Sequence, residues 1–184
     1  MTIEFVVLDT AAEVAREAAD AFVDEARVAI AERDRFVVAL PGGRTPLSTF
    51  ELLASTEYRE QVAWDRVNLY WADERAVGPD DPLSNYRGAK AAWLDRVPEI
   101  GVGQIHRMMA EGMDLDSAAW AYEAELRREV RANLAGIPVF DLVWLGVGAD
   151  GHTASLCPND ASLSVTDRLV VPTWPAGYDT ARLT

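Results

Sequence analysis

The chain has 184 residues, of which 49% are hydrophobic and 26% charged, with a formal net charge of −13 at pH 7. This length and composition suit one globular domain, and the acidic charge argues against a nucleic acid or an anionic membrane as partner. The single cysteine, Cys157, excludes an internal disulfide and a cysteine-based metal cluster. No apolar run approaches the roughly 20 residues of a membrane span, and no signal-peptide pattern is seen, so we expect a cytoplasmic protein.

The first predicted elements are a strand, a helix and a second strand. Residues 3–8 form an apolar run typical of a strand. Thr10 and Glu13 form a capping-box pattern, and apolar residues then recur at helical spacing over residues 14–30. Phe36–Leu40 is a short, buried-strand pattern.

A glycine turn follows this second strand. Gly42 and Gly43 precede Thr45, a good N-cap, and Pro46, which suits the first position of a helix. Backbone N–H groups at a helix start are a ready seat for an anion, although a plain strand–turn–helix junction explains the same residues. The turn lacks the lysine of a nucleotide phosphate loop, so ATP and GTP are not expected.

The next strand, Val67–Trp71, is followed by charged side chains. Asp73 and Arg75 suit either a solvated loop or the wall of a site in which the arginine faces an anion. Ser84 is a good N-cap for a further helix, and Asn85 lies where its amide could reach a sugar hydroxyl.

Two strands and a helix predicted between residues 104 and 171 have sequence patterns that indicate a structural role. Residues 104–108 predict a short strand with His106 between apolar neighbours, which is typical of a structural histidine. Residues 115–134 predict a long amphipathic helix, and residues 168–171 predict another strand.

The most distinctive stretch begins at residues 142–145, an apolar run typical of a strand buried on both faces. Gly148 and Gly151 permit a sharp turn, and Asp150 and His152 stand within it. A strand that ends in such a turn is where open α/β sheets usually place their chemistry. The same residues also suit a solvated turn in which the aspartate caps a short following helix.

Strands and helices alternate along nearly the whole chain, which predicts a parallel sheet covered on both faces. Right-handed crossovers would bring the loops after residues 40, 71 and 145 to one edge of that sheet. We therefore expect the three stretches with functional residues to lie together.

Four motifs in this order resemble the 6-phosphogluconolactonases, within the superfamily that includes glucosamine-6-phosphate deaminase. The motifs are Gly-Gly-Arg-Thr-Pro at 42–46, Trp-Ala-Asp-Glu-Arg at 71–75, Ser-Asn-Tyr at 84–86 and Leu-Gly-Val-Gly-Ala-Asp-Gly-His-Thr-Ala-Ser-Leu-Cys-Pro at 145–158. The resemblance covers essentially all of the chain. It implies one sugar-phosphate lactonase domain over residues 1–184 with a Rossmann-like, three-layer fold, an open and mostly parallel sheet with helices on both faces.

Two details favour a lactonase over a deaminase. Deaminases carry Asp-Glu-Tyr where this chain has Asp-Glu-Arg, and Ile-Ala-Phe-Asn where Thr-Ala-Ser-Leu follows His152. The chain also departs from the family pattern, because Pro41 and Arg44 replace two serines and Cys157 stands where phenylalanine is common. Family members continue past the position of Arg182, so we expect the domain to lack the C-terminal strand and helices and to expose a sheet edge.

The resemblance implies hydrolysis of 6-phosphoglucono-1,5-lactone, a step of the oxidative pentose phosphate pathway. His152 would activate water, Asp150 would orient the imidazole or contact the sugar, and amides of the glycine turn would face the developing oxyanion. The other residues expected to bind substrate or its phosphate are Gly42, Gly43, Arg44, Thr45, Asp73, Arg75, Asn85, Gly148, Gly151 and Arg182.

No cofactor and no metal are expected, since lactones are activated esters and the chain has only two histidines. A covalent serine route is disfavoured because no Gly-x-Ser-x-Gly elbow occurs. We expect a monomer. The alternatives are a glucosamine-6-phosphate deaminase, in which Asp73 moves the proton and His152 assists ring opening, a non-catalytic sugar-phosphate-binding module, and an inactive fragment.

Overall fold

A computed structural model describes residues 3–112 and 114–184 of the chain. Its main sheet has four parallel strands in the order β4-β2-β1-β5, and β1 pairs with β2 along its whole length from Phe36↔Val67 to Leu40↔Trp71. The strands of this sheet are β1 (Phe36–Leu40), β2 (Val67–Trp71), β4 (Ile105–His106) and β5 (Leu142–Val143).

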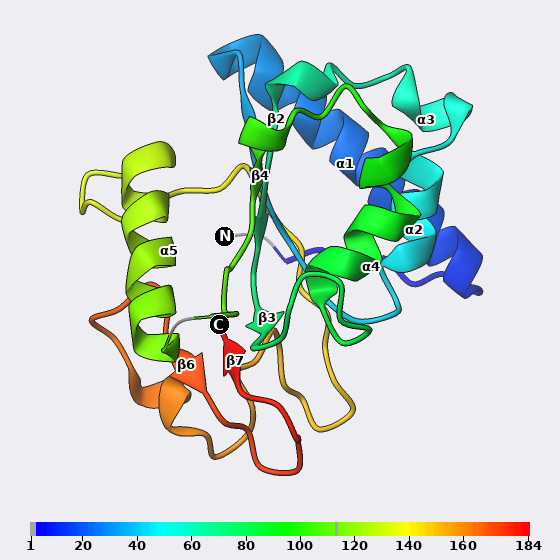
Figure 1. The fold of residues 1–184 in the computed structure, drawn as a ribbon. Coiled ribbons are helices and arrows are strands. Elements are labelled where there is room, and N and C mark those ends of the chain that lie inside the picture. The colour runs from blue at the N-terminus through cyan, green and yellow to red at the C-terminus, as the bar shows by residue number, and fades with distance from the viewer. Residues whose placement is uncertain (1–2, 113) are drawn as a thin grey trace.

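Helices cover both faces of this sheet, with α1, α2 and α4 on one side and α5 on the other (Figure 1). The predicted three-layer α/β architecture is therefore confirmed. The helices are α1 (Ala11–Arg33), α2 (Leu47–Leu53), α3 (Thr56–Arg59), α4 (Asn85–Ala92) and α5 (Leu115–Glu129), with 3-10 turns at Trp64–Arg66, Leu94–Arg96, Val102–Gln104 and Ala161–Ser164.

A second, antiparallel sheet of three short strands lies beyond the carboxyl end of β2. Its order is β3-β7-β6, formed by Glu74–Arg75, Arg182–Leu183 and Pro172–Thr173. The last of these strands, β7, pairs directly with the charged segment that follows β2. This pairing brings the end of the described chain to the edge of the sheet where functional residues were expected.

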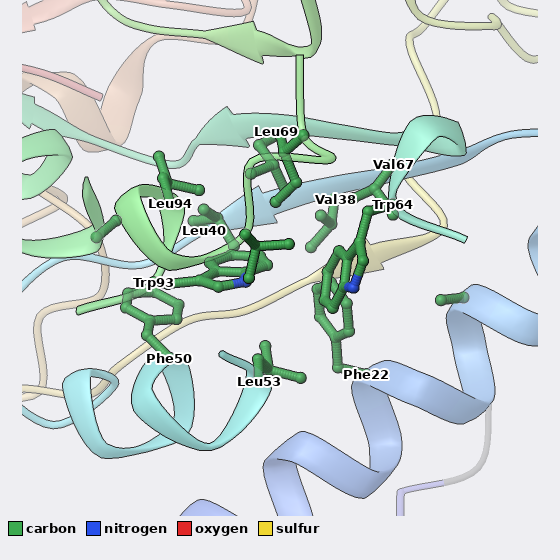
Figure 2. Close-up of a cluster of buried hydrophobic side chains, with 14 of the residues drawn as sticks. Phe22, Val38, Leu40, Phe50, Leu53, Trp64, Val67, Leu69, Trp93 and Leu94 are labelled. Carbon is green, nitrogen blue, oxygen red and sulfur yellow. The ribbon is translucent and has the colours of Figure 1, made fainter. Parts of the chain in front are cut away.

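The larger core is aromatic and fills the space between β1, β2 and the helices α1, α2 and α4 (Figure 2). Phe22 packs against Trp64 and Trp93 at ring-centroid distances of 5.9 and 5.6 Å, and Phe50 stacks on Trp93 at 5.4 Å. Burial of such large side chains is the main stabilising contribution of this layer. A smaller core, which includes Tyr70 and Leu183, joins the other face of the sheet to α5.

Local patterns correctly predicted the helix caps of α1 and α4. The Thr10 hydroxyl accepts from the Glu13 amide at 3.2 Å, and the Glu13 carboxylate accepts from the Thr10 amide at 2.9 Å. Ser84 likewise accepts from the Arg87 amide at 3.1 Å. The expected cap at Thr45 is wrong, because α2 starts one residue later and Pro46 occupies the N-cap position without a side-chain hydrogen bond.

Several predicted strands are shorter or absent. Residues 3–8 form no strand, and their apolar side chains are exposed, with Phe5 at 87%, because no strand of the described chain lies beside them. Residues 142–145 form a two-residue edge strand that is not buried on both faces, since Val143 is 48% exposed. The strand expected at residues 168–171 is irregular, and β6 begins only at Pro172.

Two helix predictions also change. The long helix ends at Glu129, short of residue 134, because Val130 adopts an extended conformation and a bridge between Ala132 and Pro138 turns the chain back. The short helix expected after His152 is a turn, with Ala154 at φ 51°.

Candidate functional site

Asp73 is the point at which the loops after β2 and β5 meet. Its carboxylate is 4% exposed and accepts a hydrogen bond from the Ser155 hydroxyl at 2.6 Å. The Asn85 amide donates to the other carboxylate oxygen at 3.1 Å and to the Asp73 carbonyl at 2.9 Å. The carboxyl ends of β2 and β5 and the start of α4 are therefore joined through one buried acid.

The loop after β1 reaches the same point through a glycine. A Cβ added at Gly42 would lie 2.1 Å from Oδ1 of Asn85, so any larger residue there would force the Asn85 amide to move. The neighbouring Gly43 has φ +85°, and Gly43, Arg44 and Thr45 are exposed. The predicted meeting of three loops at one edge of the sheet is thus confirmed by contacts of Asp73, Asn85 and Gly42.

Glu74 fastens the start of α4 to this edge. Its carboxylate accepts from the amides of Asn85 and Tyr86 at 2.7 and 2.8 Å and from the Ser84 hydroxyl at 3.0 Å. Burial raises the pKa of Glu74, and these hydrogen bonds oppose that rise because they stabilise the charged form. The glutamate is therefore a structural clamp for the helix that carries Asn85.

His152 and Asp150 lie in the turn after β5. The Nδ1 atom of the imidazole is 2.6 Å from a carboxylate oxygen of Asp150, and the same oxygen accepts the His152 amide at 3.2 Å. The hydrogen bond from the imidazole lowers the pKa of Asp150. A carboxylate on Nδ1 favours the tautomer that carries its proton there, which leaves Nε2 as the basic nitrogen.

The glycines of this turn differ from the expectation in one respect. The Gly148 amide donates to the His152 carbonyl at 2.8 Å, and the Gly151 amide donates to the Gly148 carbonyl at 2.9 Å. These two N–H groups therefore shape the turn and do not point freely at an oxyanion. The amides of Val147 and Ala149 make no hydrogen bond to any residue that the structure describes.

The arginines occupy three different settings. Arg44 is exposed, whereas Arg75 donates to the carbonyl of Leu83. Arg182 is 7% exposed, and its guanidinium lies 4.2 Å from the ring centre of Tyr178 and 3.4 Å from the Ser155 hydroxyl. Arg182 is thus part of the wall of the site. The ring of Tyr178, which Arg182 contacts, has its centre 6.2 Å from the centre of the His152 ring.

Sequence reasoning missed Ser155 and Tyr178 as members of this site. In the sequence Ser155 stood out only as part of the motif at 145–158, yet it is fully buried and its hydroxyl donates to Asp73. His106, in contrast, is the structural residue that its apolar neighbours indicated, since its ring stacks on Tyr70 at 4.2 Å and bonds Glu125 at 2.6 Å.

Residues 3–112 and 114–184 contain no cluster of three or more His, Cys, Asp or Glu side chains that could hold a metal ion. Within the same ranges, no helix is long and apolar enough to cross a membrane.

The chain is thus an α/β protein with an open parallel sheet between two helical layers and an Asp-Gly-His turn in the loop after β5. The chain belongs to the family of glucosamine-6-phosphate isomerases and 6-phosphogluconolactonases, whose sequence profile matches residues 9–184.

Individual relatives carry the lactonase name. A 6-phosphogluconolactonase of Synechocystis is 44% identical over 142 residues, and one of Nostoc is 38% identical over 165 residues, covering 77% and 90% of this chain. The chain spans 57% and 66% of the lengths of these two relatives. The crystal structure of a 6-phosphogluconolactonase from Shewanella baltica superimposes with a TM-score of 0.81 at 28% identity, covering 96% of this chain and 72% of that one.

Proposed function

We propose that this protein hydrolyses 6-phospho-D-glucono-1,5-lactone to 6-phosphogluconate, a step of the oxidative pentose phosphate pathway, with His152 as the general base. The observation that carries the proposal is the 2.6 Å contact between Nδ1 of His152 and the Asp150 carboxylate. It leaves Nε2 of a partly exposed imidazole to take a proton from water. The names of the relatives above support the lactone as substrate.

The phosphate is proposed to bind at the loop after β1. The amides of residues 42–45 donate to no residue that the structure describes, so their N–H groups are available to phosphate oxygens. The exposed guanidinium of Arg44 adds a charged donor, and Arg75 and Arg182 are the further cations proposed for this clamp. On an acidic chain such a local positive seat is needed to hold a doubly charged group.

Asp73 and Asn85 are proposed to support the loops that would surround the substrate. Their burial and mutual hydrogen bonds support a role in holding the loops around the sugar more than a role in direct proton transfer. That geometry supports hydrolysis over the deaminase alternative, in which Asp73 would have to reach substrate carbon atoms.

In this proposal the developing oxyanion accepts hydrogen bonds from the unpaired amides of the turn. The amides of Gly148 and Gly151 do not take part, because they already donate within the turn. We also propose a cytoplasmic location for this protein, because the proposed substrate is a phosphorylated metabolite. The proposal needs no nucleic-acid or membrane partner, as the sequence predicts.

The test is acid release from freshly made lactone, measured above the spontaneous rate. We expect His152→Ala to lower kcat by about 100-fold while KM changes little, because removal of a general base slows the chemical step without removing the phosphate contacts. Arg27→Ala, an exposed arginine of α1, is the surface control and should retain full activity.

Other outcomes point to the alternatives. Equal turnover in His152→Ala would exclude this residue as the base. Ammonia release from glucosamine 6-phosphate would support a deaminase, and phosphate-dependent binding without turnover would support a non-catalytic module.

A further inference from the structure

A fully buried serine connects the two halves of the candidate site. Ser155 has 0% exposure, and its hydroxyl donates to the Asp73 carboxylate at 2.6 Å. Nη1 of Arg182 lies 3.4 Å from the same hydroxyl oxygen, at the long end of hydrogen bonding. One side chain therefore links the loop after β5 to the loop after β2 and to β7.

The Ser155 hydroxyl also lies between two buried charged groups, the Asp73 carboxylate and the Arg182 guanidinium. Within the described residues, no Lys, Arg or His nitrogen comes within 4.0 Å of the Asp73 carboxylate, so the acid has no direct ion pair. Ser155 stands between Asp73 and Arg182, accepting from the cation and donating to the anion. A buried carboxylate and a buried guanidinium both require such partners, because each loses its water on burial.

The backbone around Ser155 is held as firmly as its side chain. Its amide donates to the Thr184 hydroxyl at 3.1 Å, and Thr153 and Leu156 form a bridge on either side of it. The preceding residue, Ala154, has φ 51°, a left-handed conformation that residues with a Cβ adopt only when their surroundings impose it. His152 stands at the other end of this turn, three residues before Ser155.

We propose that Ser155 is a positioning residue, whose bond to Asp73 fixes the turn between residues 152 and 155 and thereby places the imidazole of His152. This inference rests on the proposed function in so far as His152 is the general base. In this view, the buried hydrogen bonds among Asp73, Asn85, Ser155 and Arg182 hold His152 in a fixed position relative to the proposed phosphate-binding loop at residues 42–45.

Kinetics and NMR of Ser155→Ala test the proposal. We expect kcat for the lactone to fall about 10-fold with KM within about threefold, because a misplaced base slows chemistry more than it weakens binding. Ser155→Cys, which keeps the size and a weak donor, should recover part of the loss. The Hε1 signal of His152 should shift in Ser155→Ala, whereas the signal of His106, which lies on β4 and stacks on Tyr70, should stay in place and serve as an internal reference.

Ser162→Ala is the matched control. Ser162 is also buried, at 8% exposure, but it lies outside the junction around Asp73, and its amide donates to the Asp160 carboxylate at 2.8 Å. This variant should leave kcat and the His152 signal unchanged. The double variant Asp73→Asn, Ser155→Ala should lower kcat by about as much as the more damaging of the two single substitutions, because both disrupt the same hydrogen bond.

An unmoved His152 signal in Ser155→Ala would overturn the proposal, as would equal kinetic losses in Ser155→Ala and Ser162→Ala. If the parent protein hydrolyses no lactone, the proposed function fails, and the position of the His152 signal still decides whether Ser155 positions the imidazole. If Ser155→Ala does not fold, Ser155→Cys supplies the same two measurements.

Discussion

At the residue scale, the imidazole of His152 lies directly against the backbone of Gly148. A Cβ at this glycine would come within 2.2 Å of both Cε1 and Nδ1 of the imidazole and within 2.8 Å of Oδ1 of Asp150. Contacts this short force the imidazole or the turn to move. The need for glycine at position 148 is therefore steric, and it protects the geometry of the His–Asp pair.

Gly148→Ala should consequently reduce lactone turnover by about 10-fold or more while the protein remains folded, because the displaced imidazole loses its position. Steady-state kinetics and thermal unfolding of the same samples separate the two effects. Gly103→Ala is the control, since a Cβ there meets nothing within 4 Å and activity should be retained. Full activity in Gly148→Ala would show that the turn adapts without cost.

Contacts between neighbouring residues of the candidate site could be predicted from the sequence, whereas contacts between distant residues could not. Asp150 and His152 are two residues apart, so their contact could be inferred from adjacency. Ser155 bonds Asp73, which is 82 positions away in the chain, and nothing in the local pattern marks that bond. Tyr178 is brought to the site by the antiparallel β6–β7 pairing, which the local pattern did not indicate.

At the element scale, Glu123 ties α5 to the segment that leads into β6. One carboxylate oxygen accepts from Arg168 at 2.9 Å and from the Leu169 amide at 3.0 Å, and the other accepts from Arg127 at 2.9 Å. Burial of Glu123 raises its pKa, but the hydrogen bonds from Arg168, Arg127 and the Leu169 amide lower it by more, so that the pKa falls to about 2. The charged form is therefore strongly preferred in the folded state.

This depressed pKa gives stability a defined pH dependence. Because the folded pKa lies below the unfolded value of about 4.5, the stabilisation is fully present above pH 4.5 and is lost as pH falls toward 2. We expect Glu123→Gln to lower the free energy of unfolding by about 2 kcal/mol at pH 7, with the difference narrowing below pH 4.5.

Urea unfolding of both proteins from pH 7 to pH 3 measures this difference. Glu25→Gln, an exposed acid of α1, should show no such trend. A difference for Glu123→Gln that stays constant across this range would mean that the carboxylate charge contributes nothing to stability.

Elements were predicted well where their pattern is complete within the element. The helical spacing and capping box of α1, and the buried runs of β1 and β2, all have the predicted type. The predicted strand at residues 3–8 failed because a strand also needs a neighbour to satisfy its backbone groups, and the described chain supplies none there.

At the scale of the whole molecule, the main sheet has an open side at β5. Among the residues that the structure describes, β5 pairs with β1 alone. Apolar side chains continue along and beyond it, with Val143 at 48%, Leu145 at 53% and Val147 at 80% exposure. An unpaired edge with exposed apolar residues is a surface on which chains associate.

The sequence predicts a monomer, but this open edge favours self-association of the 184-residue chain at high concentration. Val143→Lys and Leu145→Lys should reduce that association, because a charge on an edge strand must be desolvated when a second strand pairs with it. Sedimentation velocity over a concentration series measures the effect, with Val28→Lys as the control, since Val28 is equally exposed, at 52%, but lies on α1. If the parent sediments as a monomer at every concentration, β5 is not an association surface and the monomer predicted from the sequence is correct.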